Sequence, residues 1–205
     1  MIDSARALAF ARSRSLCPDD EALFNLFTSA NGPLPPGAIV ELGTNKGGSA
    51  ALLATPGRPL WLFDTWAGIP AARPEVDGPA AGGLTGSMSA SFGECEESLR
   101  ALGSRPRMIQ GDWRKTLPPL VQEIGQVALL HIDGDWYDSV LTGLRLLADA
   151  VPNGGVIVLD DFGWWEGARR AFYQWCRETG AEPLLERCGR HQAWWRVGYE
   201  THRGA

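Results

Sequence analysis

Lysine is scarce in this sequence. Only Lys46 and Lys115 occur among 19 basic residues, and with 24 acidic residues the formal net charge is −5. Electrostatic binding of nucleic acid requires a basic face, because contacts from Lys and Arg to phosphates supply most of its affinity. The charge balance therefore excludes an electrostatic nucleic-acid binder, and we expect a small-molecule partner.

Long apolar runs are also lacking. No stretch approaches the ~20 apolar residues of a membrane-spanning helix, and the opening residues MIDSARALAFARSRSLC lack the apolar core of a signal peptide. The four cysteines, Cys17, Cys95, Cys176 and Cys188, form no Cys-x-x-Cys pair. We therefore expect reduced thiols rather than disulfides or zinc ligands, in a cytoplasmic protein that binds no membrane.

The sequence has the length of one domain. Its 205 residues, 44% of them hydrophobic, suffice for one sizeable core but are few for two. We expect residues 1–205 to form a single domain, with residues 1–36 as an N-terminal helical segment. Residues 66–86 are rich in Gly, Pro and Ala and too long for an ordinary connection, so we expect them to form a mobile lid or substrate loop.

Short apolar runs alternate with helix candidates. The runs are nearly continuous, as expected of strands buried on both faces, and they cover residues 38–42, 60–63, 127–132 and 156–159. The helix candidates cover residues 49–54, 89–102, 139–150 and 166–179. This alternation predicts an α/β fold with an open, mostly parallel sheet covered by helices on both faces. A closing strand pair is expected at residues 182–186 and 193–197.

Acidic residues follow the predicted strands with no Lys or Arg between them. Asp133 and Asp135 come after one run, and Asp160 and Asp161 after the next. Two carboxylates about 4 Å apart repel by roughly 4 kcal/mol at an effective dielectric near 20. The cluster is therefore expected to share protons or bind a cation, and oxygen ligands favour Mg2+, Ca2+ or Mn2+. In the alternative, Asp161 caps the next helix, Asp133 lies at a solvated strand end, and the four acids never converge.

A glycine-rich turn follows the first predicted strand. The sequence VELGTNKGGS at residues 40–49 fits neither G-x-G-x-x-G nor the P-loop pattern. Its glycines allow close approach of a ligand, and the next helix begins with free N–H groups. Asp64 ends the second strand, 21 residues after Gly43, where doubly wound folds place an acid that binds ribose hydroxyls. These features predict a nucleoside ligand without a required pyrophosphate, and an ordinary tight turn is the alternative.

Aromatic residues follow the same predicted strand ends. They are Trp66, Trp113, Trp136, Trp164 and Trp165. This placement predicts an aromatic-walled pocket for a sugar face or a planar ring, although any one of them can instead fill the core. His131 lies two residues before Asp133, on the same face of the strand. We interpret it as a buried or supporting residue rather than a catalytic one.

Five sequence blocks in a fixed order resemble the macrocin O-methyltransferase family. They are VELGTNKGGSA, LFDTWAGIP, MIQGDWRKTLPP, LLHIDGDWYDS and PNGGVIVLDDFGWWEGARRA. That family includes deoxysugar O-methyltransferases of macrolide and aminocoumarin biosynthesis. The resemblance implies a Rossmann-like class I methyltransferase fold with a seven-stranded sheet, S-adenosylmethionine as cofactor, and a Mg2+ or Mn2+ ion. Family members carry a longer N-terminal helical region, which helps cover the substrate, than the 37 residues before Ala38. The resemblance therefore does not identify the acceptor.

The resemblance also implies roles for individual residues. Asp133, Asp160 and Asp161 would hold the metal, and Asp135 would be the general base, so that Asp133 and Asp135 form the catalytic pair. The resemblance implies that Glu41, Gly43 and Asp64 surround the amino acid and ribose of the cofactor. It also implies that Asp112 and Trp113 lie near the adenine. With the neighbouring residues of these blocks, the expected cofactor site comprises Glu41, Gly43, Thr44, Asn45, Gly47, Ser49, Asp64, Thr65, Asp112, Trp113 and Asp133.

Methyl transfer from a sulfonium requires an oxygen nucleophile aligned behind the methyl group. A divalent ion can lower the pKa of a hydroxyl and orient it, and a nearby carboxylate can accept the proton. This chemistry favours two adjacent oxygens, as in a sugar of a glycosylated natural product or, second, a catechol. Two further hypotheses are a catalytically silent cofactor-binding partner protein and a phosphatase with an Asp-x-Asp motif, whose pattern Tyr137 breaks. The sequence also allows a homodimer.

Overall fold

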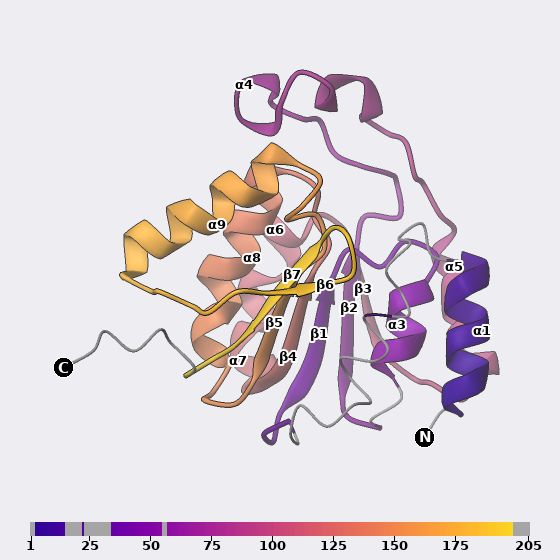
Figure 1. Ribbon diagram of the computed structural model, residues 1–205. Coiled ribbons are helices and arrows are strands. Elements are labelled where there is room, and N and C mark those ends of the chain that lie inside the picture. The colour runs from indigo at the N-terminus through magenta and orange to yellow at the C-terminus, as the bar shows by residue number, and fades with distance from the viewer. Residues whose placement is uncertain (1–2, 15–21, 23–33, 55–56, 199–205) are drawn as a thin grey trace.

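The chain folds around one seven-stranded sheet (Figure 1). The computed structural model describes residues 3–14, 22, 34–54 and 57–198. The strand order is β3-β2-β1-β4-β5-β7-β6, and only the pairs that involve β7 are antiparallel. The strands are β1 (Ala38–Leu42), β2 (Leu60–Asp64), β3 (Arg107–Gln110), β4 (Val127–Ile132), β5 (Val156–Leu159), β6 (Glu186–Cys188) and β7 (Gln192–Arg196). The order reverses between β1 and β4, and the predicted Rossmann-like class I methyltransferase fold is confirmed.

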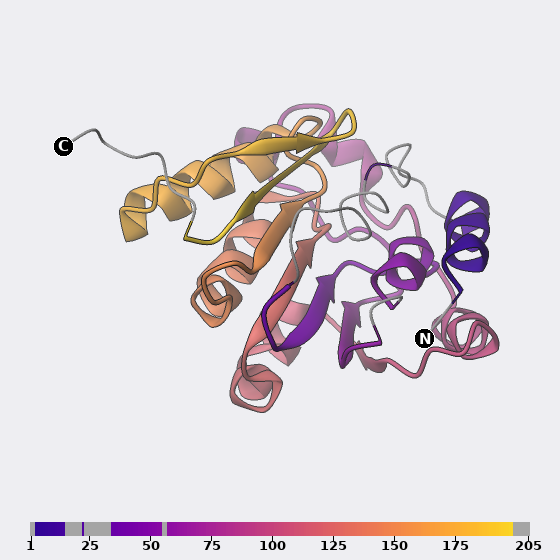
Figure 2. The ribbon, with the colours of Figure 1, turned by 60° about the horizontal axis from the view of Figure 1, so that its bottom comes forward.

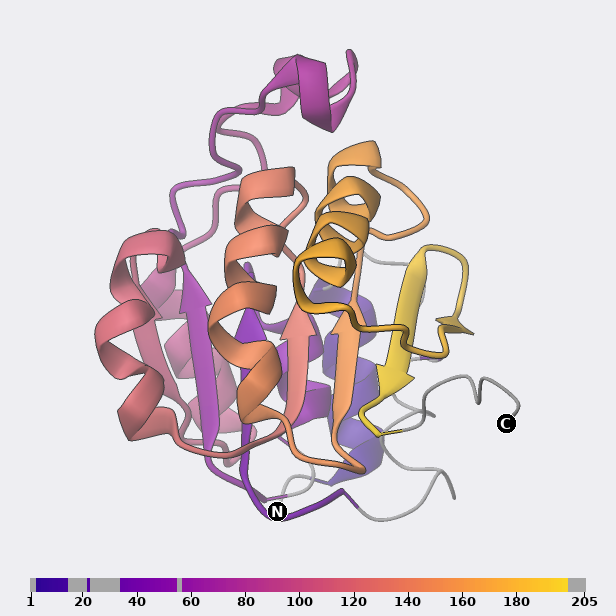
Figure 3. The same ribbon diagram turned by 90° about the vertical axis from the view of Figure 1, so that its left-hand side faces the viewer.

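Helices cover both faces of the sheet, as Figures 2 and 3 show. One face carries α1 (Ser4–Arg14), α3 (Gly48–Leu53) and α5 (Phe92–Ala101). The other carries α6 (Trp113–Thr116), α7 (Val121–Ile124), α8 (Tyr137–Leu147) and α9 (Glu166–Thr179), with the short turns η2 (Pro118–Leu120) and η3 (Ala148–Ala150). Of the N-terminal helical segment expected at residues 1–36, the structure describes α1, and the rest lies largely outside the described residues. No helix in the described ranges is long and apolar enough to cross a membrane.

Alternation along the strands divides the core into two layers. In β1, Val40 and Leu42 pack with α8 and α9, whereas Ile39 packs with α1 and α3. Because successive side chains of a strand point to opposite faces, Glu41 shares the face of Ile39. The β1–β4 register places Glu41 opposite His131. Two polar residues therefore lie side by side within the apolar layer beneath α3.

Two strands differ from the sequence-based expectations. β3 (Arg107–Gln110) was missed, because an edge strand that begins with an exposed Arg and ends with an exposed Gln shows no continuous apolar run. A closing strand pair is present as β6 and β7, but β6 shares only Glu186 with the expected residues 182–186 and extends to Cys188, and β7 begins at Gln192 rather than at residue 193. Pro183 lies within the expected strand and has no N–H to donate to a neighbouring strand.

The segment of residues 66–86 carries short helices rather than an irregular loop. These are α4 (Pro74–Asp77) and η1 (Ala81–Leu84), and α4 lies above the sheet in Figure 1. Ile69 and Ala81 are buried against Trp136, which follows β4. The segment thus packs on the end of the sheet where the acidic residues lie, and its mobility stays a prediction.

The described cysteines fit the expectation of reduced thiols. Cys95 and Cys176 carry no disulfide. Burial raises the pKa of the Cys95 thiol to about 12 and that of Cys176 to about 11. Both are therefore protonated and unreactive at neutral pH. Cys17 lies outside the described residues.

Candidate active site

A cavity of about 690 Å³ lies at the carboxyl ends of the parallel strands. This volume is typical of small-molecule sites, which occupy roughly 300–1,000 Å³. Most residues of the expected cofactor site line it: Gly43, Thr44, Asn45, Ser49, Asp64, Thr65, Asp112, Trp113 and Asp133. Glu41 and Gly47 are not in the lining, because Glu41 is fully buried in β1 and Gly47 forms the cap before α3. The glycine turn and the acid cluster thus face one space.

Gly43 allows the first turn to pass close to the strand-end acids. Its φ is +98°, and a Cβ atom there would lie 1.8 Å from the carbonyl oxygen of Asp133. Any other residue would therefore displace the backbone of Asp133. The sequence pattern identified this glycine, but the close contact arises from the pairing of β1 with β4, in which Asp133 N donates to Leu42 O at 2.8 Å.

Asp64 organises the glycine turn from the end of β2. Its Oδ2 accepts hydrogen bonds from the backbone N–H groups of Thr44 and Asn45, at 2.8 and 2.7 Å. Its Oδ1 accepts from Trp66 N at 2.6 Å. One carboxylate thus fixes both the glycine turn and the start of residues 66–86. Asp64 also lines the cavity, as expected of a residue beside a bound nucleoside.

Several buried polar atoms at this turn have no hydrogen-bond partner among the described residues. They are Thr44 Oγ1, Asn45 Oδ1 and, behind the turn, Glu41 Oε2. Buried polar groups in folded proteins are almost always hydrogen-bonded. Thr44 and Asn45 both line the cavity, so the turn offers hydrogen-bonding groups that a ligand with polar substituents would satisfy. S-adenosylmethionine, with its amino acid group and ribose, fits this turn.

Asp112 and Trp113 form the wall next to β3. Asp112 caps α6 and accepts hydrogen bonds from Arg114 N at 3.0 Å and from its guanidinium at 2.7 Å. The hydrogen bonds from Arg114 hold the pKa of Asp112 below its ordinary value. Trp113 is buried, and its Nε1 donates to Ser139 O at 3.3 Å. A fixed indole surface therefore faces the part of the cavity where the resemblance implies an adenine.

Three of the four predicted acids converge. Asp133, Asp135 and Asp161 each contribute a carboxylate oxygen, and these oxygens lie within 4.8 Å of one another. Burial and repulsion between the acids raise the pKa values of Asp133 and Asp161 well above the ordinary range and that of Asp135 to about 7. A divalent cation would relieve this repulsion, and an all-oxygen ligand set fits a hard ion such as Mg2+. The cluster thus fits a hard divalent ion, but it contains Asp135, the expected general base, in place of Asp160 from the expected ligand set.

Asp160 faces the core side of this cluster. Its Oδ1 accepts a short hydrogen bond from Gln192 Nε2 and lies 3.7 Å from His131 Nε2. His131 Nδ1 lies 3.1 Å from Glu41 Oε1. Glu41, His131 and Asp160 therefore form a buried row across β1, β4 and β5.

His131 supplies a positive charge beside the acids, which no Lys or Arg provides in the sequence around them. Burial alone would lower the pKa of His131, but its contacts with Asp160 and Glu41 outweigh burial and raise the pKa to about 9. The imidazole is thus protonated at neutral pH. Its position between two carboxylates, away from the cavity lining, agrees with the interpretation of His131 as a buried or supporting residue.

Asp135 projects from a strained turn. Its φ of +53° is uncommon for a residue other than glycine. Its Oδ1 accepts from Trp165 Nε1 at 3.2 Å, and its backbone N donates to Asp161 Oδ2 at 3.1 Å. Asp135 is thus held by an aromatic neighbour while its backbone orients the next acid of the cluster.

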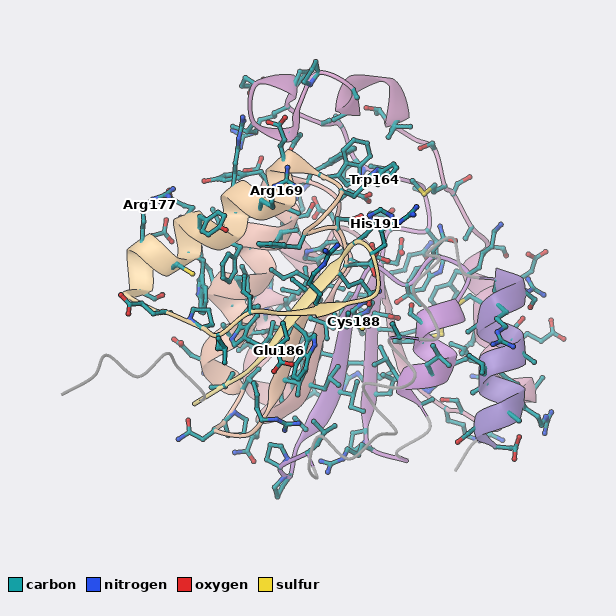
Figure 4. The ribbon with its side chains drawn as sticks, viewed as in Figure 1. Trp164, Arg169, Arg177, Glu186, Cys188 and His191 are labelled. Atoms are coloured by element: carbon teal, nitrogen blue, oxygen red, sulfur yellow. The ribbon has the colours of Figure 1, made fainter. Side chains whose placement is uncertain are left out.

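The aromatic residues divide between the cavity and the core. Trp113, Trp164 and Trp165 line the cavity, whereas Trp66 and Trp136 are buried and are not in its lining. Trp164 is 59% exposed. Figure 4 shows it beside His191, and their ring centroids lie 4.7 Å apart. One open wall of the cavity is thus aromatic, as the sequence predicted.

The turn between β6 and β7, together with the first residue of β7, contributes residues that the sequence did not indicate. Arg190, His191 and Gln192 all line the cavity. Because β7 runs antiparallel to β5 with Ala193 opposite Leu159, its first residue comes beside Asp160. Arg14, Met88 and Ser139 were also missed, and none carries a sequence signal that distinguishes it from ordinary helix or loop residues.

Comparisons with known proteins find similar O-methyltransferases. A family model described as macrocin-O-methyltransferase (TylF) matches residues 26–197. The 8-demethyl-8-(2,3-dimethoxy-alpha-L-rhamnosyl)-tetracenomycin-C 4'-O-methyltransferase of Streptomyces olivaceus is 27% identical over 179 residues, which cover 78% of this chain and 66% of the relative. The demethyldecarbamoylnovobiocin O-methyltransferase of Streptomyces niveus is 27% identical over 141 residues, or 62% of this chain and 53% of the relative. The chain thus spans about half to two thirds of these relatives.

A solved structure shares the fold. The O-methyltransferase NovP superposes with a TM-score of 0.73 at 23% identity, covering 86% of this chain and 78% of NovP.

Proposed function

Because the chain belongs to the macrocin O-methyltransferase family, we propose that it transfers a methyl group from S-adenosylmethionine to a hydroxyl of a small molecule. The acceptor in this proposal is a sugar of a glycosylated natural product. The relative from Streptomyces olivaceus supports a sugar acceptor, since its name specifies a rhamnosyl tetracenomycin. The observation that carries the proposal is that the glycine turn and the acid cluster face a single cavity.

In this proposal the cofactor lies along the ends of β1, β2 and β3. Thr44 and Asn45 hydrogen-bond its polar substituents, Asp64 keeps the turn in shape and faces the ribose, and Trp113 packs on the adenine. Glu41 does not line the cavity and would act from behind the turn. S-adenosylmethionine would supply an activated methyl group bound to a positively charged sulfur.

In this proposal Asp133, Asp160 and Asp161 would hold Mg2+ or Mn2+, and Asp135, which lies in the same cluster, would be left to accept the proton. Gln192 and His131 both contact Oδ1 of Asp160, which leaves Oδ2 for the ion. Such an ion would lower the pKa of an acceptor hydroxyl and orient its neighbouring oxygen.

Asp135 is the general base. A carboxylate beside the acceptor hydroxyl can take up its proton, which is the role of a general base. Trp165 holds Oδ1, so that Oδ2 is the atom that accepts the proton of the acceptor hydroxyl. Asp135 also lines the cavity, as this role requires.

The acceptor lies between the acid cluster and the aromatic wall. An exposed indole such as that of Trp164 can pack on the apolar face of a sugar ring, and His191 extends the same surface. Two adjacent sugar hydroxyls then reach the acids. A catechol offers the same pair of oxygens and is the second candidate.

Product analysis tests the proposed function. The protein is incubated with Mg2+, deuteromethyl-labelled S-adenosylmethionine and a panel that contains rhamnosides, other vicinal-diol glycosides and catechol. Mass spectrometry should find the label on a sugar oxygen. Label on catechol alone would favour the second candidate, and no labelled product from any diol would contradict an O-methyltransferase role.

A further inference from the structure

We propose that Asp77 is a positioning residue for Asp135: its buried carboxylate ties residues 66–86 to the first turn of α8, and so fixes the turn that presents Asp135 to the cavity. This inference rests on the proposed function, in which Asp135 accepts a proton. Asp77 does not itself line the cavity. It acts through the residues that follow Asp135.

Asp77 makes two hydrogen bonds with its two carboxylate oxygens. Oδ1 accepts from Tyr137 N at 2.7 Å, and Oδ2 accepts from Arg73 N at 2.7 Å. Tyr137 is the first residue of α8, and the first N–H groups of a helix have no partner within it. The residue before α8, Trp136, provides no side-chain cap. Asp77, 60 residues earlier in the chain and only 2% exposed, supplies that cap.

The start of α9 closes over the same hydrogen bond. A Cβ atom on Gly167 would lie 2.2 Å from Asp77 Oδ1 and 2.9 Å from Tyr137 N. The backbone of α9 therefore passes so close to the contact that only a glycine fits. A carboxylate enclosed in this way holds the two segments in one relative position.

Trp136 links the segment of residues 66–86 to Asp135, the proposed general base. Its Nε1 donates to Pro70 O at 2.8 Å, and its ring packs on Ile69. The same ring meets Trp165 edge to face at a centroid distance of 5.1 Å, and Trp165 Nε1 holds Asp135 Oδ1. The two residues after Asp135 are thus both fixed by the segment of residues 66–86.

The conformation of Asp135 makes this support necessary. A positive φ in a residue other than glycine persists only where the surroundings over-determine it. Loss of the Asp77 contact would release the first turn of α8. The backbone of Asp135 could then relax from its positive φ. A displacement of about 1 Å at a catalytic group can cost on the order of 10²-fold in rate.

Two variants disturb the contact by different means. Asp77→Asn leaves one acceptor oxygen where two N–H donors need one each. Gly167→Ala keeps the carboxylate but forces it away by steric contact. The matched control is Gly83→Ala in the same segment, because Gly83 has no atom within 4 Å of an added Cβ.

Hydrogen–deuterium exchange tests the connection without reference to activity. Amide exchange in a peptide that covers residues 133–139 should be faster in Asp77→Asn and in Gly167→Ala than in the wild type. Exchange at residues 43–49 should be unchanged, and Gly83→Ala should match the wild type at both places. Unchanged exchange at residues 133–139 in both variants would overturn the proposal.

Turnover with S-adenosylmethionine and methyl α-L-rhamnopyranoside tests the role in positioning. Both variants should lower kcat by about 10- to 100-fold while the KM for S-adenosylmethionine stays the same. In an Asp135→Asn background Asp77→Asn should have little further effect, since both act on one group. A lower melting temperature with unchanged kcat would overturn the proposal. Should the wild type form no product from this rhamnoside, the exchange result alone decides whether Asp77 holds the turn, and the acceptor panel decides the proposed function.

Discussion

Glu41 and His131 face each other across β1 and β4, with Oε1 of Glu41 3.1 Å from Nδ1 of His131. Both side chains are buried. On its other side the imidazole lies 3.7 Å from Asp160. A buried protonated histidine thus connects the strand that leads into the glycine turn with the strand that leads into the acid cluster.

The first prediction concerns the stability that depends on this pair. Glu41→Ala removes one of the two carboxylates that contact the buried imidazole, and breaking a buried pair costs about 3–5 kcal/mol in comparable cases. Urea unfolding should show a loss of this size. The control Glu96→Ala breaks the exposed pair with Arg100 and should change the free energy of unfolding by no more than about 1 kcal/mol. Equal, small losses in both variants would show that the buried pair contributes nothing specific.

The second prediction concerns the close approach at Gly43. Gly43→Ala places a Cβ atom 1.8 Å from Asp133 O at a positive φ, so the turn must shift or the fold must lose stability by more than about 1 kcal/mol. Isothermal titration should show at least a tenfold loss in affinity for S-adenosylhomocysteine. Gly83→Ala, with open space around it, should bind like the wild type. Normal binding by Gly43→Ala would contradict the assignment of the cofactor to this turn.

The third prediction concerns the aromatic wall. Trp164→Ala removes an exposed indole that lines the cavity, and the KM for the acceptor should rise by roughly 2- to 13-fold, as expected for loss of about 0.5–1.5 kcal/mol of aromatic contact. The KM for S-adenosylmethionine should not change. Leu184→Ala, exposed to a similar degree but absent from the lining, is the control. An equal effect of both variants would remove Trp164 from the acceptor site.

The fourth prediction concerns the metal. The carboxylates of Asp133, Asp135 and Asp161 lie within 4.8 Å of one another, and Asp160 lines the same cavity. Such a cluster should require a cation for a fully ionised state, so EDTA should abolish turnover and added Mg2+ or Mn2+ should restore it. Asp160→Asn should weaken Mg2+ binding, and high Mg2+ should partly rescue its turnover. Full turnover in EDTA, with no metal detected by mass spectrometry of the same sample, would refute the metal site.

Much of the fold followed from the sequence because the central strands are buried on both faces. Residues 38–42 and 127–132 are nearly continuous apolar runs, broken only by Glu41 and His131, and the structure gives β1 and β4 the same bounds. The edge strand β3 (Arg107–Gln110) had no such signal, since its ends are exposed and polar. Burial on both faces, rather than strand propensity, made the prediction reliable.

The candidate site was predictable to the extent that it depends on parallel strands. Their carboxyl ends meet at one edge, which brings Asp133 and Asp161 together from separate parts of the chain. The orientation of Asp160 was not predictable, because it depends on Gln192, which lies 32 residues later on an antiparallel strand. No local pattern specifies that register.

The fifth prediction separates Asp133 from Asp135 and tests the division between metal ligand and general base. Mg2+ affinity, by calorimetry, and kcat are measured for Asp133→Asn and Asp135→Asn with one labelled acceptor. Asp135→Asn should keep Mg2+ affinity within about twofold and lower kcat by about 10²- to 10⁴-fold, the usual contribution of a general base. Asp133→Asn should lose Mg2+ affinity and recover part of its turnover at high Mg2+. Loss of the metal in Asp135→Asn, with retention in Asp133→Asn, would contradict both assignments.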